Sequence, residues 1–173
     1  MRIAGVDPGS GGGIALIDTG HSGLSRDAQV ADLPVSRDKS LSWIDGLLLS
    51  EQFRLFAPQI MVIERVSAMP HQGVTSCFHF GMAFGSILSV AEAMHIPLHL
   101  VTPVVWKKAL KLPGGKNKKP ALRLARETFP NVDLRLEKHH NRAEALLIAL
   151  WYCDFYPNKH LTVPPAGVPQ VFL

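Results

Sequence analysis

The chain opens with MRIAGVDPGSGGGIALID, in which a short apolar run leads directly into a carboxylate, Asp7. A proline and five small residues, Gly9–Gly13, come next, and a second apolar run follows them. Two apolar runs joined by a glycine-rich turn predict a β-hairpin over residues 2–7 and 14–18. The chain is therefore expected to begin with a rigid strand that ends in a negative charge beside a turn.

Length and composition limit the class of protein. The 173 residues, 47% of them apolar, can bury a substantial core and predict a single domain. We expect one folded domain over residues 1–156, followed by an extended tail over residues 157–173, which holds four prolines. We recognise no membrane-spanning run and no signal peptide, and Cys77 and Cys153 are too few for a disulfide framework. These features favour a soluble protein of the cytoplasm with buried free thiols.

Hydrophobic periodicity predicts a third strand and then alternating helices and strands. The predicted strands span residues 28–34, 59–63 and 98–101, and the predicted helices span residues 40–56, 77–94, 118–128 and 141–155, with another helix starting at Thr102-Pro103. In the first helix Ser40 is the cap, and the apolar stripe comprises Leu41, Ile44, Leu47, Leu48 and Leu55. The helix over 77–94 is expected to be buried. A hairpin followed by strands with helical crossovers predicts an α/β fold with a mixed five-stranded sheet.

A second carboxylate, Glu64, follows the apolar run 59–63 in the way that Asp7 follows the first strand. If these strands are neighbours, the two charges lie side by side and repel by roughly 4 kcal/mol at about 4 Å, for an effective dielectric constant of about 20. A bound cation, or protonation of one acid, would relieve that repulsion. Oxygen ligands without cysteine favour Mg²⁺ or Mn²⁺.

A third carboxylate, Glu144, lies in the first turn of the last predicted helix, in HHNRAEALLIAL. His140 and Asn141 precede it by four and three residues, and both spacings place side chains over one helix surface. The three acids also have ordinary structural explanations. Asn141 and Glu144 fit a capping box, Asp7 begins a turn sequence, and Glu64 could pair with Arg65 or another surface cation. Three acids that each end or begin an element favour a shared metal site.

The basic residues are concentrated in one segment. From Lys107 to Arg142 the chain has eleven lysines and arginines and three acids, a net charge of +8, whereas the whole chain carries +4. Such a segment is typical of a surface that binds a polyanion, although a solvated lysine-rich loop has the same composition. Trp106 at its start and Gly114–Gly115 within it favour nucleic acid.

Four stretches together resemble the RuvC family of Holliday-junction resolvases, within the ribonuclease H-like superfamily, and are nearest its phage and organellar branch. They are IAGVDPGSGGGIALID, MVIERVSAMPHQGVTSCFHFG, TPVVWKKALKLPGGKNKK and NRAEALLIAL, and they span residues 3 to 150. The resemblance implies a ribonuclease H-like fold and a homodimer that nicks four-way DNA junctions in pairs, in the cytoplasm beside the nucleoid. The helix over 77–94 would suit the dimer face.

The resemblance also implies the functional residues. Asp7, Glu64 and Glu144 match the metal ligands of a two-ion site for Mg²⁺ or Mn²⁺, with His140 as our choice of fourth group and Asn141 as the alternative. Lys107 and Lys118 match catalytic lysines near the scissile phosphate. The residues expected to bind DNA are Lys107, Lys108, Lys116, Lys118, Lys119 and Arg123. The wedge that opens the junction is expected to be Met69 or Phe78.

Two other functions share part of this pattern. A phosphotransferase of the actin or sugar-kinase type also begins with a strand, an aspartate and a glycine-rich turn. That class needs a second such domain, for which 173 residues leave no room. A protein that binds junctions without cleaving them would keep the basic segment and lack a complete ligand set.

Overall fold

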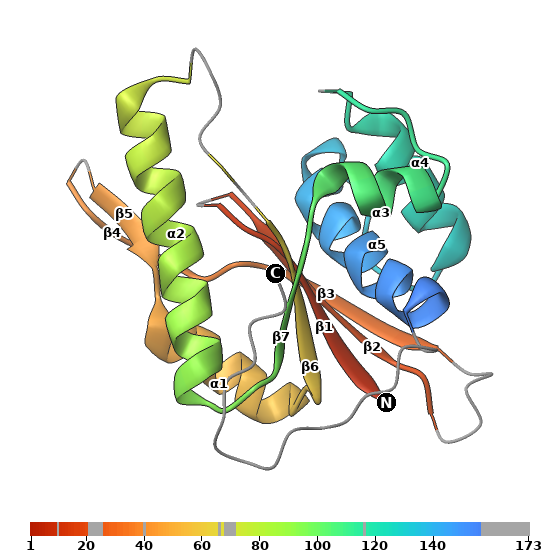
Figure 1. The fold of residues 1–173 in the computed structure, drawn as a ribbon, viewed down its shortest axis with the longest axis horizontal. Helices are drawn as coiled ribbons and strands as arrows, with labels where there is room; N and C mark the ends of the chain where they lie inside the picture. Colours follow the sequence, from red (N-terminus) through yellow and green to blue (C-terminus); the bar gives the residue numbers. More distant parts are fainter. Residues whose placement is uncertain are drawn as a thin grey trace.

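The computed structural model describes residues 1–9, 11–20, 26–39, 41–65, 67, 72–115 and 117–156. A five-stranded sheet runs through its centre in the order β3-β2-β1-β6-β7 (Figure 1). Its strands are β1 (Arg2–Asp7), β2 (Gly13–Asp18), β3 (Asp27–Asp32), β6 (Ile60–Glu64) and β7 (Leu98–Val101). The first three strands are antiparallel, and β1, β6 and β7 are parallel. The predicted mixed sheet is confirmed.

Helices cover both faces of the sheet (Figure 1). One face carries α1 (Gly46–Phe56) and α2 (Val74–Ala93), beside a small hairpin of β4 (Val35–Asp38) and β5 (Leu41–Ile44). The other face carries α3 (Pro103–Ala109), α4 (Lys119–Thr128), the 3-10 turn η1 (Glu137–His139) and α5 (His140–Phe155). The two faces bury two separate apolar clusters.

The alternation of side chains along the strands assigns each acid to a face. In β1, Ala4 and Val6 lie in the cluster under α1 and α2, whereas Ile3 lies in the cluster under α5. Successive strand residues point to opposite faces, so Asp7 points to the α5 side. Val62 of β6 also lies in the α5 cluster, and the same alternation sends Glu64 to that side.

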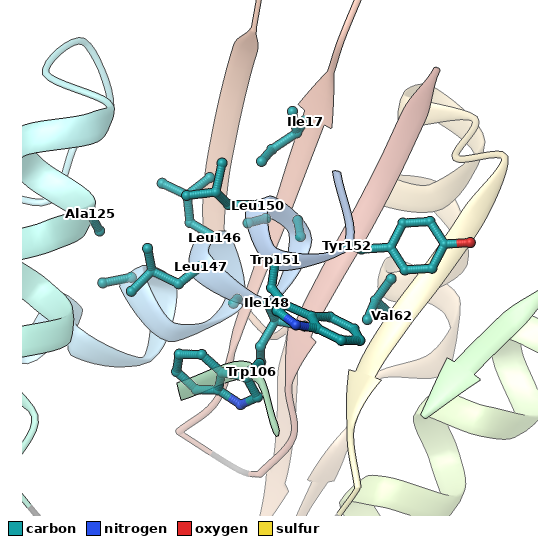
Figure 2. Packing of buried hydrophobic residues seen from close by; sticks show 14 of the residues in the cluster. Ile17, Val62, Trp106, Ala125, Leu146, Leu147, Ile148, Leu150, Trp151 and Tyr152 are labelled. Carbon is teal, nitrogen blue, oxygen red and sulfur yellow. The ribbon is translucent and has the colours of Figure 1, made fainter. Parts of the chain in front are cut away.

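The last helix, α5, is buried on all sides from Ala143 to Tyr152. Figure 2 shows its leucines and aromatic rings filling the space between the sheet and the outer helices. The helix backbone rests on β1 at Gly5, where an added Cβ would lie 2.1 Å from the carbonyl oxygen of Ala145. Residue 5 must therefore lack a side chain for the helix to reach this position.

The predicted helix over 40–56 is wrong in its first third. Residues Leu41–Ile44 form β5, and α1 begins only at Gly46, capped by Asp45, whose carboxylate accepts from the Leu48 amide at 3.0 Å. The predicted cap, Ser40, lies outside the described residues. The predicted stripe is also wrong within the helix, because the buried residues are Leu49 and Phe53. The exposed leucines of α1 are Leu47, Leu48 and Leu55.

The second helix is less buried than expected. It begins at Val74, three residues early, and only Ala83, Ile87 and Ala91 are fully buried. Within the described residues it alone is long and apolar enough to cross a membrane, so the expectation that no stretch reaches that length is not met. One such helix is weak evidence for a membrane span, since it passes the test by length and composition only.

The predictions for the cysteines and for the remaining helices are only partly confirmed. Cys77 and Cys153 are free, as expected, but both are half-buried instead of buried. The remaining helices begin within a residue of their predicted starts, at Pro103, Lys119 and His140. The proposed extended tail, residues 157–173, lies outside the described residues.

The contact between Gly5 and α5 predicts a large effect of a single methyl group. Gly5→Ala should destabilise the fold by about 3 kcal/mol or more, because the new Cβ would collide with helix backbone that cannot rotate away. Gly85→Ala is the control, since a Cβ there meets nothing within 4 Å and alanine favours an exposed helix by about 0.5–1 kcal/mol. Urea denaturation of both variants measures the difference, and equal stabilities would contradict the proposed packing.

Candidate active site

Two carboxylates lie together at the ends of neighbouring parallel strands. Asp7 and Glu64 each come one residue after the paired residues Val6 and Ile63. Asp7 is only 9% exposed. Burial raises the pKa of Asp7 to about 7; the nearby Glu64 carboxylate adds to this rise, and the Lys118 and Lys107 ammonium groups oppose it. A negative charge at Asp7 is thus under-compensated by the protein itself.

Glu64 is held by a tryptophan from the basic segment. The indole Nε1 of Trp106 donates a hydrogen bond of 2.7 Å to Glu64 Oε2. Within the described residues Glu64 forms no ion pair with Arg65, so the simple surface pairing considered above does not occur.

Glu144 is the most deeply buried of the three acids, at 2% exposure. Lys107 Nζ lies 2.9 Å from its Oε1, and Lys118 Nζ donates to its Oε2. Oε1 has no hydrogen-bond partner among the described residues, so the Lys107 contact is a charge attraction without hydrogen-bond geometry. The capping-box explanation is wrong, because α5 starts at His140, its N-cap forms no side-chain bond, and Glu144 turns inward to the lysines.

The two candidates for a fourth ligand have different surroundings. Asn141 Nδ2 donates to the carbonyl oxygen of Gly11, in the glycine-rich turn that follows Asp7. His140 Nδ1 lies 3.0 Å from the carbonyl oxygen of Glu137, in the preceding turn of its own segment. These contacts connect Asn141, more directly than His140, to the loop beside Asp7.

A clamp that sequence reasoning missed fixes the start of α5. Arg142 donates two hydrogen bonds to the carboxylate of Asp32 on β3, at 2.6 and 2.7 Å. These bonds from Arg142 are the main reason that the pKa of Asp32 is lowered. The clamp stands beside Gly13, where an added Cβ would lie 2.6 Å from the α5 backbone. One sequence carries no signal for a pair 110 residues apart.

The predicted basic residues divide into two groups. Lys107 and Lys118 lie among the acids, and burial lowers the pKa of Lys118, whereas Asp7 and Glu64 raise it. Lys108 lines an open groove with Glu64 and Lys107. Lys119 and Arg123 are exposed on α4. Lys116 lies outside the described residues, as does Met69, and Phe78 is 60% exposed on α2.

The oxygen donors of the site suit a hard cation, but those of the described residues are not close enough together in this structure to coordinate one. No three His, Cys, Asp or Glu side chains of the described ranges lie close enough to hold a metal ion, and two ammonium groups lie among the carboxylates instead. The site nevertheless supplies three carboxylates, a buried Glu144 oxygen without a hydrogen bond, and an Asp7 with a raised pKa. The raised pKa of Asp7 indicates that the lysines do not fully compensate its negative charge.

The raised pKa of Asp7 predicts a pH dependence of stability in metal-free protein. The folded state binds a proton at Asp7 that the unfolded state releases above its pKa of 3.8, so stability is highest below that value and falls as pH rises to about 7. Asp7→Asn should remove this fall, which amounts to at most about 4 kcal/mol. Denaturation in the presence of a chelator, at about pH 5 and about pH 8, measures it. An identical pH dependence in both proteins would contradict the assignment.

Sequence comparison finds related junction-cleaving proteins, although no protein-family model matches the chain. The chain is 31% identical to the crossover junction endodeoxyribonuclease RuvC of Brevibacillus brevis over 165 residues, which cover 90% of this chain and 93% of that protein. The RuvC of Corynebacterium efficiens is 24% identical over 88% of the chain and 69% of its own length. The chloroplastic Holliday junction resolvase MOC1 of Chlamydomonas reinhardtii is 35% identical over 51% of the chain, but this match spans a tenth of MOC1.

Solved structures show the same fold. A T. thermophilus RuvC in complex with a Holliday junction substrate superposes with a TM-score of 0.61 at 16% identity, over 88% of this chain and 94% of that one. The yeast mitochondrial Holliday junction resolvase Ydc2 superposes with a TM-score of 0.53 at 15% identity, over 88% and 77%. The ribonuclease H-like fold is confirmed. Because the Brevibacillus protein matches over nearly the full length of both chains, this chain belongs to the RuvC family of crossover junction endodeoxyribonucleases.

Proposed function

We propose that this protein is a metal-dependent endonuclease that resolves four-way DNA junctions by paired phosphodiester hydrolysis. The observation that carries the proposal is the convergence of Glu144 with Lys107 and Lys118 on the face where Asp7 and Glu64 end their strands. The named relatives are crossover junction endodeoxyribonucleases and a Holliday junction resolvase. Its place of action would be the cytoplasm, at the nucleoid.

Asp7, Glu64 and Glu144 would hold two ions of Mg²⁺ or Mn²⁺. When bound, such a pair supplies an activated water and stabilises the leaving oxygen of an in-line displacement. The residue contacts favour Asn141 over our first choice, His140, as the fourth group, because Asn141 already contacts the turn beside Asp7. The rigid strand ends hold Asp7 and Glu64 in place while α5 supplies the opposing side.

Lys107 and Lys118 would serve the phosphate. Both ammonium groups reach the centre of the acidic site, so a phosphodiester seated there would lie within their reach and gain stabilisation as its charge develops. Lys108 and Lys111 in the adjoining groove would follow the DNA backbone away from the cleavage point.

A second copy of the chain would supply the paired cut. The outward face of α2 is apolar and open, with Val74 87% exposed and Phe78 60% exposed, and it suits a helix contact between two copies. Of the two residues expected to be the wedge that opens the junction, Phe78 is the one that lies within the described residues.

The described fold argues against one of the two rival functions, the phosphotransferase. A phosphotransferase needs a second glycine-rich domain, and the described residues form one sheet-centred unit beside a two-stranded hairpin. Junction binding without cleavage stays the alternative, since it requires only the basic surface. A synthetic four-way junction incubated with and without Mg²⁺ separates cleavage from binding directly.

Glu144 gives the sharpest test of the catalytic proposal. Glu144→Gln should lower the cleavage rate by on the order of 100-fold or more, because it removes a ligand charge, while junction affinity is retained. Glu127→Gln on exposed α4 is the matched control and should cleave normally. Cleavage of a labelled junction and gel-shift binding provide the two measurements. Full cleavage by Glu144→Gln would contradict the proposal.

The basic segment predicts a salt dependence. Replacing Lys107, Lys116 and Lys118 with alanine should flatten the log–log slope of affinity against salt by up to about three units, if each lysine meets one phosphate. Junction and linear duplex should weaken alike, because phosphate contacts do not select shape. Binding isotherms across a salt series, for parent and variant, measure both slopes. An unchanged slope would place the DNA surface elsewhere.

A further inference from the structure

We infer that Trp106 is a positioning residue of the active site, which holds Glu64 and Lys107 in the places that metal binding requires. The inference rests on the proposed function and adds a residue to it. Trp106 lies on α3 and is completely buried, and its single polar group, the indole N–H, bonds an acid of the site.

The indole N–H fixes one oxygen of Glu64. A buried indole needs a hydrogen-bond acceptor, and Trp106 finds it in Glu64 Oε2 at 2.7 Å. A bond from a neutral donor to a carboxylate is charge-assisted and short, so it restrains the rotation of that carboxylate. Oε1 of Glu64 receives no hydrogen bond from the described residues and is the oxygen left for a cation.

The indole ring fixes a lysine on the same side. Lys107 Nζ lies 5.0 Å from the centroid of the Trp106 ring, within the range of a cation–π interaction. The same ammonium group lies 2.9 Å from Glu144 Oε1. A continuous series of contacts therefore runs from Glu64 on β6, through Trp106 and Lys107 on α3, to Glu144 on α5.

The core holds the indole rigidly enough for this task. Trp106 belongs to the apolar cluster under α5, which also contains Ile148 and Trp151 (Figure 2). A side chain fixed by packing can transmit that rigidity to the carboxylate that it bonds, as partners of metal ligands commonly do. Phenylalanine would fill most of the same space and keep a ring under Lys107, yet it has no N–H. The change Trp106→Phe therefore isolates the hydrogen bond.

The matched control is Trp151→Phe. Trp151 lies in the same cluster, is 6% exposed, and contacts other aromatic rings instead of the acids. Both variants should lose some stability through the space left in the core. Only Trp106→Phe should also weaken Mg²⁺ binding, by about 10-fold or more. The measured quantity is the Mg²⁺ concentration that gives half of the maximal rise in melting temperature, with no DNA present.

A fluorescence titration gives a second readout that does not depend on a folded Trp106→Phe protein. The chain has three tryptophans, so Trp43→Phe combined with Trp151→Phe leaves Trp106 as the only one. Mg²⁺ should shift the emission of this protein, because an ion bound to Glu64 changes the charge beside the indole N–H of Trp106. Adding Asp7→Asn should abolish the shift.

The outcomes separate the two claims. A parent protein without any Mg²⁺ response would overturn the proposed metal site and this inference with it. A normal parent response that is unchanged in Trp106→Phe, or a Trp106 emission that ignores Mg²⁺, would overturn only the positioning role. Equal weakening in Trp106→Phe and Trp151→Phe would also overturn it, because the effect would then come from core packing.

Discussion

The close approach of α5 to the sheet is the constraint on which the rest of the structure depends. At Gly5 and Gly13 the helix backbone takes the space that a Cβ would fill. A helix that packed through side chains would stand several ångströms further out, near the usual 10 Å between packed layers. Glu144 would then move away from Asp7 and from both lysines. Gly5 and Gly13 therefore determine how closely α5, with Glu144, approaches the sheet.

The electrostatics of the site follow from that depth. Three carboxylates and two ammonium groups lie together, and two of the acids, Asp7 and Glu144, are buried, whereas the Lys118 side chain is 38% exposed. Burying such charges is unfavourable unless each is compensated, and here the compensation is incomplete at Asp7. The fold tolerates this unfavourable electrostatic energy because the charged groups have little freedom to separate. They are held by the strand ends, by the Arg142–Asp32 clamp and by the packing of α5. Such a site is well suited to bind additional positive charge.

The sequence predicted what is local or periodic, and failed where contacts are distant. The positions of Asp7 and Glu64 at the ends of two apolar runs predicted that they would meet if those strands were neighbours, and helical spacing separated Glu144 from the core stripe. Three consecutive leucines, Leu47–Leu49, do not define which face of a helix is buried, so the predicted apolar stripe of α1 is wrong. The predicted helix also begins too early, because residues 41–44 form β5. Trp106–Glu64 and Arg142–Asp32 join residues 42 and 110 positions apart, and no periodicity records such pairs. Family resemblance named Lys107 and Lys118 as residues near the phosphate, but their ion pairs with Glu144 were not predicted.

The long reach of these contacts also bears on when the site comes into existence. A chain is made from its N-terminus, so the segments of β1 and β6 that carry Asp7 and Glu64 leave the ribosome well before α5, although a domain generally folds as a unit. Until α5 covers Gly5, that face of the sheet is open and the acids lack both Glu144 and the lysine that α3 turns toward it. A chain that has not yet released α5 therefore lacks one carboxylate of the proposed site. The proposed ability to cut DNA would appear only once the last helix has been made and has packed against Gly5 and Gly13.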